Sequence, residues 1–433
     1  MNSAKQDRSP LPLEVTPAGA TSAFGDLLER VSSECGTPFY LYDAAEFATR
    51  CRELRSVLPG EASPRLLYSF KANPLPSVAN ELRVGGCEAD LTSPGELHSA
   101  MEAGFDLSRA LYGGPGKSAA EYSGAIASGV RHFSVESCGD LSRLSRAAGE
   151  LGEPVAALLR INPNSAPKAK LAMSGVASQF GFEEEELRSL GARIHEFASA
   201  EVKLAGFHLY WGTQIAEIDA ILASFEKTVE LADELAMIAG IEIGILNLGG
   251  GFAWPYAHRG QGTDPSPLRE GLAGIHARSG ASRSADWWFE SGRYLAGSSG
   301  MLVSRVMEVK RSKDDRWFLI LDTGIHHLGG MAGLGRIPRF SIDLIVPESR
   351  IGAGTRVVDV VGPLCTPLDC LAKRLELPVV EPGDLVAIPN VGAYGATASV
   401  GAFLSRPAPP EVLHRDGEIL AIHRLRTGHE RVR

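Results

Sequence analysis

The chain has 433 residues and a formal net charge of −9 at pH 7. Hydrophobic residues make up 44% of it and charged residues 22%, which is typical of a globular protein and excludes a wholly disordered chain. The acidic balance argues against a nucleic-acid surface, and no apolar run reaches the roughly 18 residues of a membrane span. Six scattered cysteines form neither a disulfide framework nor a zinc motif, so we expect no metal site and a reducing, cytoplasmic setting.

Residues 1–36 are expected to form an N-terminal lead-in and helix: residues 1–25 are rich in proline, alanine and serine and read as a loose lead-in, and the helix is predicted at 24–33. After a strand-like segment at 37–42, short β-rich runs alternate with amphipathic helical stretches, which implies parallel strands. The eight runs lie at residues 66–72, 87–93, 110–113, 132–137, 155–163, 204–213, 245–252 and 287–295. Eight such units in about 250 residues predict an α/β fold, a (β/α)8 barrel, with a doubly wound sheet as the structural alternative.

Beyond residue 300 the pattern changes to strands separated by turns, and helical periodicity is scarce. The strands of this part are predicted at residues 301–309, 316–322, 356–361 and 385–388. We therefore expect a barrel over residues 37–300 and a mostly β C-terminal domain over residues 301–433. The strand at 37–45 is a candidate member of the second domain, because it precedes the first barrel helix.

Polar residues stand at the ends of many predicted barrel strands, where barrel enzymes carry their active sites. Lys71 ends the first run after an apolar alternation, so we expect it to point inward at a buried strand end. Burying a lysine costs free energy unless it is paired or neutral. Lys71 is therefore either a Schiff-base lysine or a strand-end lysine that extends its amine to solvent. The other strand ends carry Asp90, Arg160, His208, Tyr210, Thr213, Glu290 and Arg293.

The seventh run leaves its strand through three consecutive glycines, Gly249, Gly250 and Gly251. Without side chains, backbone N–H groups can approach an anion closely, so this turn suits a phosphate group. A plain tight turn is the alternative explanation. The glycine-rich stretch from Gly113 to Lys117 leaves the same two explanations open.

Five motifs follow one another in the order known from one family: Tyr68–Asn73, the three glycines, Glu290–Arg293, Gly362–Cys365 and Asn390–Tyr394. Over about residues 37–410, the chain resembles the fold-type III pyridoxal-phosphate decarboxylases, which include ornithine and diaminopimelate decarboxylases. The resemblance implies an alanine-racemase-like barrel followed by a β domain. It also implies pyridoxal 5'-phosphate as cofactor, decarboxylation of an amino acid, and a homodimer with shared active sites.

The resemblance further implies roles for single residues. Lys71 would hold the cofactor covalently, Glu290 would face its pyridine nitrogen, and Cys365 would be a catalytic thiol contributed across the dimer interface. The other positions matched to the cofactor site are Asp90, Arg160, His208, Tyr210, Thr213, Gly249, Gly250, Gly251, Gly292, Arg293 and Tyr394. A carboxylate beside the ring nitrogen keeps it protonated and makes the ring a deep electron sink, which favours decarboxylation over racemisation.

Three departures from the family pattern are visible. Tyr210 stands where the family has a ring-stacking histidine, with His208 two residues earlier on the same strand face. Thr366 stands where diaminopimelate decarboxylases have a glutamate that grips the distal end of the substrate. A segment with His326 and His327 replaces their Leu-Arg-Pro segment. Because the last two losses fall on substrate contacts, we expect the chemistry to be retained and the substrate to be changed.

Several of the sequence segments named above resemble the corresponding segments of decarboxylases of specialised metabolism. One such branch acts on a glutamyl group tethered to an acyl carrier protein in the butirosin pathway, and another acts in siderophore pathways. Both take substrates with bulky distal groups. A basic loop lies where a distal contact is expected, and its members are His326, His327, Arg336 and Arg339. This loop favours an acidic or phosphorylated extension, unless it is merely solvated.

Two other functions remain open. Asp369 could bind an amine, which keeps diaminopimelate or another diamino acid as an alternative substrate. The alternative of another class is a non-catalytic relative that binds a regulatory partner. The presence of both Lys71 and Cys365 argues against this second alternative.

Overall fold

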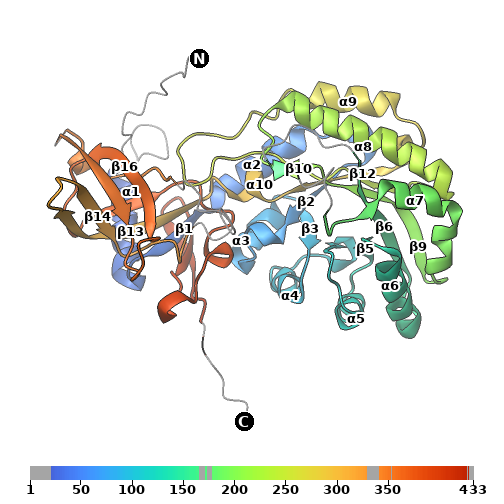
Figure 1. Ribbon diagram of the computed structural model, residues 1–433, viewed down its shortest axis with the longest axis horizontal. Helices are drawn as coiled ribbons and strands as arrows, with labels where there is room; N and C mark the ends of the chain where they lie inside the picture. The colour runs from blue at the N-terminus through green and yellow to red at the C-terminus, as the bar shows by residue number, and fades with distance from the viewer. Residues whose placement is uncertain are drawn as a thin grey trace, which may run out of the picture. The chain divides into compact units, whose positions relative to one another are not determined.

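The computed structural model describes residues 21–164, 171–172, 178–328, 341–352, 354–426 and 428 (Figure 1). The chain divides into two compact units. The barrel unit consists of Glu46–Trp254 and Gln261–Ala296. The β unit consists of Met1–Ala45, Pro255–Gly260 and Gly297–Arg433.

The barrel unit contains a closed ring of eight parallel strands. In ring order they are β2 (Arg65–Ser69), β3 (Glu88–Leu91), β4 (Leu111–Tyr112), β5 (His132–Val135), β6 (Val155–Asn162), β9 (Val202–Leu209), β11 (Ile245–Asn247) and β12 (Asp286–Ser291). The pairing of β5 with β6 leaves no open edge, so the predicted barrel is confirmed and the doubly wound sheet is excluded. Three short strands accompany the ring: β7 (Leu171–Ala172), β8 (Phe182–Glu183) and β10 (Gly212–Thr213).

Helices follow most of the ring strands and lie outside them (Figure 1). They are α2 (Ala44–Val57), α3 (Pro76–Val84), α4 (Pro94–Glu102), α5 (Ala119–Ala127), α6 (Cys138–Leu151), α7 (Glu184–Leu190), α8 (Ile218–Ala239), α9 (Leu268–Arg278) and α10 (Arg293–Ala296). Serine side chains cap α4, α5 and α6, and α8 ends at Gly240, whose φ of 64° suits glycine. Within the described ranges, no helix is both long and apolar enough to cross a membrane.

The inside of the barrel is layered. One layer is a buried apolar cluster of Leu67, Leu111, Leu158, Ala205, Ile245 and Trp288. Two residues further along three of these strands stand Arg160, Asn247 and Glu290. Because side chains on a strand alternate between its two faces, these polar residues face inward above the apolar layer. The inside of the barrel is therefore lined by polar side chains near the carboxyl ends of the strands.

The β unit is built around one eight-stranded sheet. Its strands are β1 (Phe39–Asp43), β13 (Gly300–Arg311), β14 (Trp317–Leu321), β15 (Thr355–Val361), β16 (Cys370–Pro378), β17 (Leu385–Ile388), β18 (Glu411–Arg415) and β19 (Glu418–His423). Strand β1 lies between β13 and β18, so the first strand of the chain belongs to this sheet. Helix α1 (Thr21–Cys35) packs Leu27, Leu28 and Val31 into the core of the unit. The expected combination of barrel and mostly β domain is thus confirmed.

Candidate active site

The barrel unit holds most of the residues that the sequence singles out. They are Lys71, Asp90, Arg160, His208, Tyr210, Thr213, Gly249, Gly250, Gly251, Glu290, Gly292 and Arg293. They lie at or just beyond the carboxyl ends of the strands. The β unit holds the others, which are His326, His327, Cys365, Asp369 and Tyr394.

Lys71 lies directly after β2, in the short 3-10 turn Phe70–Ala72. Its two neighbours in this turn are buried, whereas its own side chain is 45% exposed. Its Nζ lies 3.9 Å from Asp90 Oδ2 and 5.9 Å from the centre of the Tyr210 ring. The turn therefore brings an amine to the polar end of the barrel, between groups from two other strand ends.

Glu290 is buried near the end of β12. Its Oε1 accepts a hydrogen bond from Asn247 Nδ2 at 2.8 Å and lies 3.2 Å from His208 Nε2. Burial acts to raise the pKa of Glu290, but His208, Lys71 and Asn247 outweigh it and lower the pKa to about 2. Glu290 is thus ionised at any ordinary pH. Among the described residues, Oε2 of this carboxylate has no hydrogen-bond donor.

Asp90 is the second buried carboxyl group of the site. Burial, assisted by the negative charge of Glu290, raises its pKa to about 7 against the opposing effect of Lys71 and Ser69. The two carboxyl groups therefore differ in charge near neutral pH. Glu290 is a fixed anion, while Asp90 exchanges a proton in the physiological range.

Replacing Asp90 by asparagine is expected to stabilise the cofactor-free protein increasingly as pH rises from about 4 to 7, after which the gain levels off. The carboxyl group titrates near 3.8 when unfolded and near 7 when folded, so the wild-type protein loses stability as pH rises between these two values and no further above about 7. The gain has an upper bound of about 4 kcal/mol. Thermal unfolding of both proteins across this pH range measures it, and a difference independent of pH would contradict the raised pKa.

His208 and Tyr210 have different surroundings, although the sequence left their roles open. His208 is buried on β9, with its Nδ1 2.8 Å from Ser134 Oγ and its Nε2 facing Glu290. Tyr210 follows the strand and is the aromatic ring near Lys71. Sequence reasoning missed Ser134 and Asn247, which contact His208 and Glu290.

The three-glycine turn runs too close to neighbouring backbone for side chains. A Cβ on Gly250 would lie 1.9 Å from the Glu290 carbonyl oxygen, and one on Gly249 would lie 2.5 Å from the Leu209 carbonyl oxygen. Gly249 and Gly251 also have φ values of 68° and 103°, which favour glycine. The turn is thus held against the ends of β9 and β12, beside Glu290.

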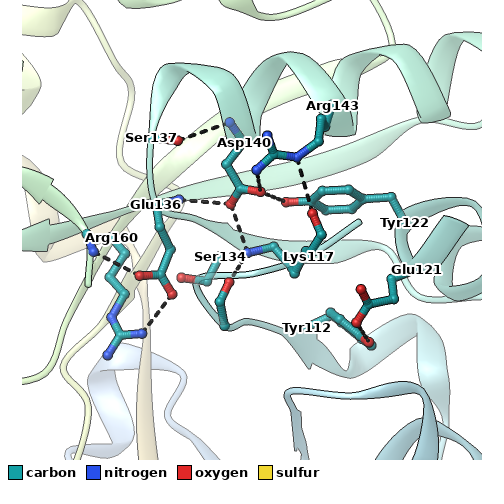
Figure 2. Close-up of polar contacts among 12 residues, drawn as sticks. Tyr112, Lys117, Glu121, Tyr122, Ser134, Glu136, Ser137, Asp140, Arg143 and Arg160 are labelled. Atoms are coloured by element: carbon teal, nitrogen blue, oxygen red, sulfur yellow. Dashed lines mark hydrogen bonds and ion pairs between the residues drawn. The ribbon is translucent and has the colours of Figure 1, made fainter. Parts of the chain in front are cut away.

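Arg160 on β6 is the register neighbour of His208. Its Nη1 donates to Glu136 Oε1 at 2.8 Å, and Glu136 Oε2 accepts from the Gly181 N–H at 2.8 Å (Figure 2). The guanidinium also lies 4.7 Å from the Phe180 ring centre. Glu136, which sequence reasoning missed, therefore fixes both Arg160 and Gly181, which directly precedes β8.

The glycine-rich stretch from Gly113 to Lys117 ends in a buried ion pair, which Lys117 forms with Asp140. Lys117 Nζ lies 2.8 Å from Asp140 Oδ2, and both side chains are almost fully buried (Figure 2). Asp140 also accepts hydrogen bonds from Tyr122 and Arg143. Burial lowers the pKa of Lys117, against the effect of Asp140. The geometry favours a structural loop over a phosphate loop here, because the lysine is engaged inside the protein.

In the β unit, Cys365 is exposed and Asp369 is buried. Asp369 Oδ1 accepts from the Ile325 N–H at 2.9 Å and Oδ2 accepts from the Leu364 N–H at 2.8 Å. Glycines face the carboxylate, since a Cβ on Gly324 would lie 2.2 Å from it. Asp369 therefore joins the loop after β14 to the segment that carries Cys365.

His326 and His327 are buried, and their ring centres lie 3.6 Å apart. Burial lowers the pKa of each ring to about 4. Both rings are therefore neutral near pH 7 and do not supply the positive charge on which the expectation of an acidic extension relied. Arg336 and Arg339, the other members of that loop, lie outside the described residues.

Comparison with known proteins identifies the family. The model of the pyridoxal-dependent decarboxylases, pyridoxal binding domain, matches residues 44–297. The chain belongs to this family. Individual decarboxylases are also similar to this chain over nearly its whole length. The L-glutamyl-[BtrI acyl-carrier protein] decarboxylase of Niallia circulans is 33% identical over 402 residues, covering 91% of this chain and 92% of that protein.

Diaminopimelate decarboxylases are similar to a comparable degree. That of Zymomonas mobilis is 31% identical over 390 residues, covering 89% of both chains. The crystal structure of the Helicobacter pylori enzyme, complexed with L-lysine, matches with a TM-score of 0.79 and 26% identity, covering 92% of this chain and 95% of that one. This pyridoxal-dependent decarboxylase is thus an amino-acid carboxy-lyase, and the comparisons leave its substrate open.

The polar end of the barrel fits pyridoxal phosphate, the cofactor of the family. Glu290 is a buried anion with one oxygen available to a pyridine N–H. Lys71 supplies a partly exposed amine 3.9 Å from Asp90 at the same end of the barrel, as covalent attachment to an aldehyde requires. The turn at Gly249–Gly251 has no room for side chains because neighbouring backbone fills that space, which a tight turn requires and a phosphate turn allows.

Proposed function

We propose that this pyridoxal-dependent decarboxylase acts on an amino acid with a large distal extension, either tethered to a carrier protein or part of a siderophore-type precursor. The observation that carries the proposal is the environment of Asp369. This acidic group follows Cys365 in the chain, but both of its oxygens already accept backbone N–H groups. With Thr366 in place of glutamate, the Cys365 segment offers no spare carboxylate for a distal amine. The similarity to a decarboxylase named for a carrier-linked glutamyl group supports the same substrate class.

In this proposal, each residue of the barrel end has a separate task. Lys71 would hold the cofactor covalently, Glu290 would hold its pyridine nitrogen, and Tyr210 would be the aromatic side chain that packs on it. Asp90, Arg160, His208, Thr213 and Gly292 line the site. The phosphate would be held by Gly249, Gly250, Gly251 and Arg293. When bound, pyridoxal phosphate supplies an electron sink for the pair left when carbon dioxide departs.

Cys365 completes the site from a second copy of the chain in this proposal, and either Cys365 or Lys71 returns the proton to the α-carbon. Its side chain is exposed, and large apolar side chains of the same unit are exposed too. Leu368 is 61% exposed, and Leu404 is 52% exposed on a segment that Arg406 joins to Pro363 by a hydrogen bond. Exposed apolar side chains beside a reactive thiol support burial against a partner, here a homodimer.

Carbon dioxide release from a panel of amino acids tests the substrate. We expect weak or no turnover of free diaminopimelate, lysine and ornithine, and turnover of a glutamyl group thioesterified to a carrier protein or of citryl-diaminopropionate. Heat-inactivated protein and protein stripped of cofactor serve as controls. Turnover of a free diamino acid with kcat/KM above roughly 10⁴ M⁻¹s⁻¹ would overturn the proposed substrate class.

A diamino-acid substrate is the second candidate. It is favoured by the similarity to diaminopimelate decarboxylases such as that of Aquifex aeolicus, which is 30% identical over 404 residues. The same panel distinguishes the two candidates, because each predicts turnover of a substrate that the other excludes.

A further inference from the structure

Ser134, His208 and Glu290 come from three strands of the barrel and form one line of contacts. Ser134 Oγ lies 2.8 Å from His208 Nδ1, and His208 Nε2 lies 3.2 Å from Glu290 Oε1. The three residues are 0%, 5% and 4% exposed. We propose that His208, oriented by Ser134, is a positioning residue that fixes the Glu290 carboxylate opposite the ring nitrogen of the cofactor. This inference rests on the role proposed above for Glu290.

The position of the imidazole proton follows from its two neighbours. Nε2 faces a carboxylate oxygen, so the contact is favourable only when Nε2 carries a proton. The Ser134 hydroxyl can donate to Nδ1, which then remains an acceptor, and this leaves the proton on Nε2. The same hydroxyl can accept from Nδ1 when the ring is doubly protonated. Ser134 thus supports a donor toward Glu290 in either charge state of His208.

The contacts of Glu290 show what this donor does to the carboxylate. His208 and Asn247 both meet Oε1, so the other oxygen stays available in the described part of the site. Asn247 is itself fixed, because its Oδ1 accepts from the Gly249 N–H at 2.8 Å and its Nδ2 must then face Glu290. The hydrogen bond from Asn247 and the 3.2 Å contact of His208 Nε2 both fall on Oε1, so together they define the direction in which Oε2 points.

The charged groups around Ser134, His208 and Glu290 either favour or oppose the ionised form of Glu290. Burial acts to raise the pKa of Glu290, and among the groups that lower it His208 comes before Lys71 and Asn247. Asp90 opposes ionisation of Glu290 through its own negative charge when it is deprotonated. Arg160, beside His208 on β6, is paired with Glu136. Removing the His208 imidazole is expected to weaken the hold of Glu290 on a proton-bearing ring nitrogen because the carboxylate loses the contact that fixes its orientation.

Two substitutions at position 208 separate positioning from packing. Glutamine places an amide donor near the site of Nε2, whereas asparagine places one near the site of Nδ1 and leaves Glu290 without it. The readout is the nitrogen chemical shift of ¹⁵N-labelled pyridoxal phosphate bound to the holoenzyme, followed against pH. We expect the wild-type and His208→Gln proteins to keep a pyridinium signal, and His208→Asn to lose it at a pH at least about one unit lower, with kcat reduced about tenfold and KM little changed.

The outcomes are distinct. Asparagine and glutamine variants that behave alike, or an unchanged nitrogen signal in His208→Asn, would overturn the inference. If His208→Asn does not fold, Ser134→Ala provides the test, because it removes only the outer contact and should move the signal in the same direction by less. A wild-type protein that borohydride does not label at Lys71, or whose ring nitrogen is unprotonated, would instead contradict the proposed function itself.

Discussion

Replacing Lys71 by alanine is expected to reduce kcat/KM at least about 10⁴-fold, because in the proposed function this residue attaches the cofactor covalently and is one of the two candidates that return a proton. The loss should exceed that of any neighbouring substitution, since Lys71 is the amine that the structure places beside Asp90 and Tyr210. Steady-state carbon dioxide release and the visible absorption of the purified protein measure the effect.

Lys203→Ala is the matched control for this substitution. Lys203 lies on β9 with an exposed side chain, so its loss should leave activity and absorption unchanged. Retention of more than about a tenth of the wild-type activity by Lys71→Ala would contradict the covalent role.

Replacing Cys365 by alanine is expected to reduce kcat about 10²- to 10⁴-fold, the range typical of a lost general acid. If this thiol serves the site of a second subunit, mixing the inactive Cys365→Ala and Lys71→Ala proteins restores activity. Random exchange should restore about a quarter of the wild-type activity, because half of the dimers are mixed and each of these has one complete site of two.

Cys138→Ala is a useful control for the thiol, because Cys138 is partly exposed and begins α6 outside the proposed site. Subunit exchange must be demonstrated independently, for example with two differently tagged proteins. Proven exchange with no recovery of activity would contradict a shared site.

The barrel could be predicted from the sequence because its strands are short apolar runs separated by helices. The inward face could be predicted as well, since Glu290 follows the buried Trp288 by two residues, as Arg160 follows Leu158. Ser134 and Asn247 could not be found in this way. A serine and an asparagine inside apolar strands carry no distinct signal, and their contacts depend on which strands are neighbours in the closed ring.

The β unit was predicted less completely. Strands β18 and β19 were missed, although Asp416 and Gly417 between them, with φ values of 50° and 81°, form an Asp-Gly turn that is typical of hairpins. Strand β16 was missed because charged residues interrupt its alternation and its pairing with β15 is irregular. The charge of His326 and His327 depends on burial, which the sequence did not reveal.

Borohydride reduction of the cofactor-loaded protein, followed by peptide mapping, tests most directly whether the barrel end at Lys71 is the site of pyridoxal chemistry. The structure predicts a single pyridoxyl label on the peptide that contains Lys71, with none on Lys117, whose amine is buried in an ion pair with Asp140. A label on any other lysine, or none on Lys71 in a protein that binds the cofactor, would contradict it.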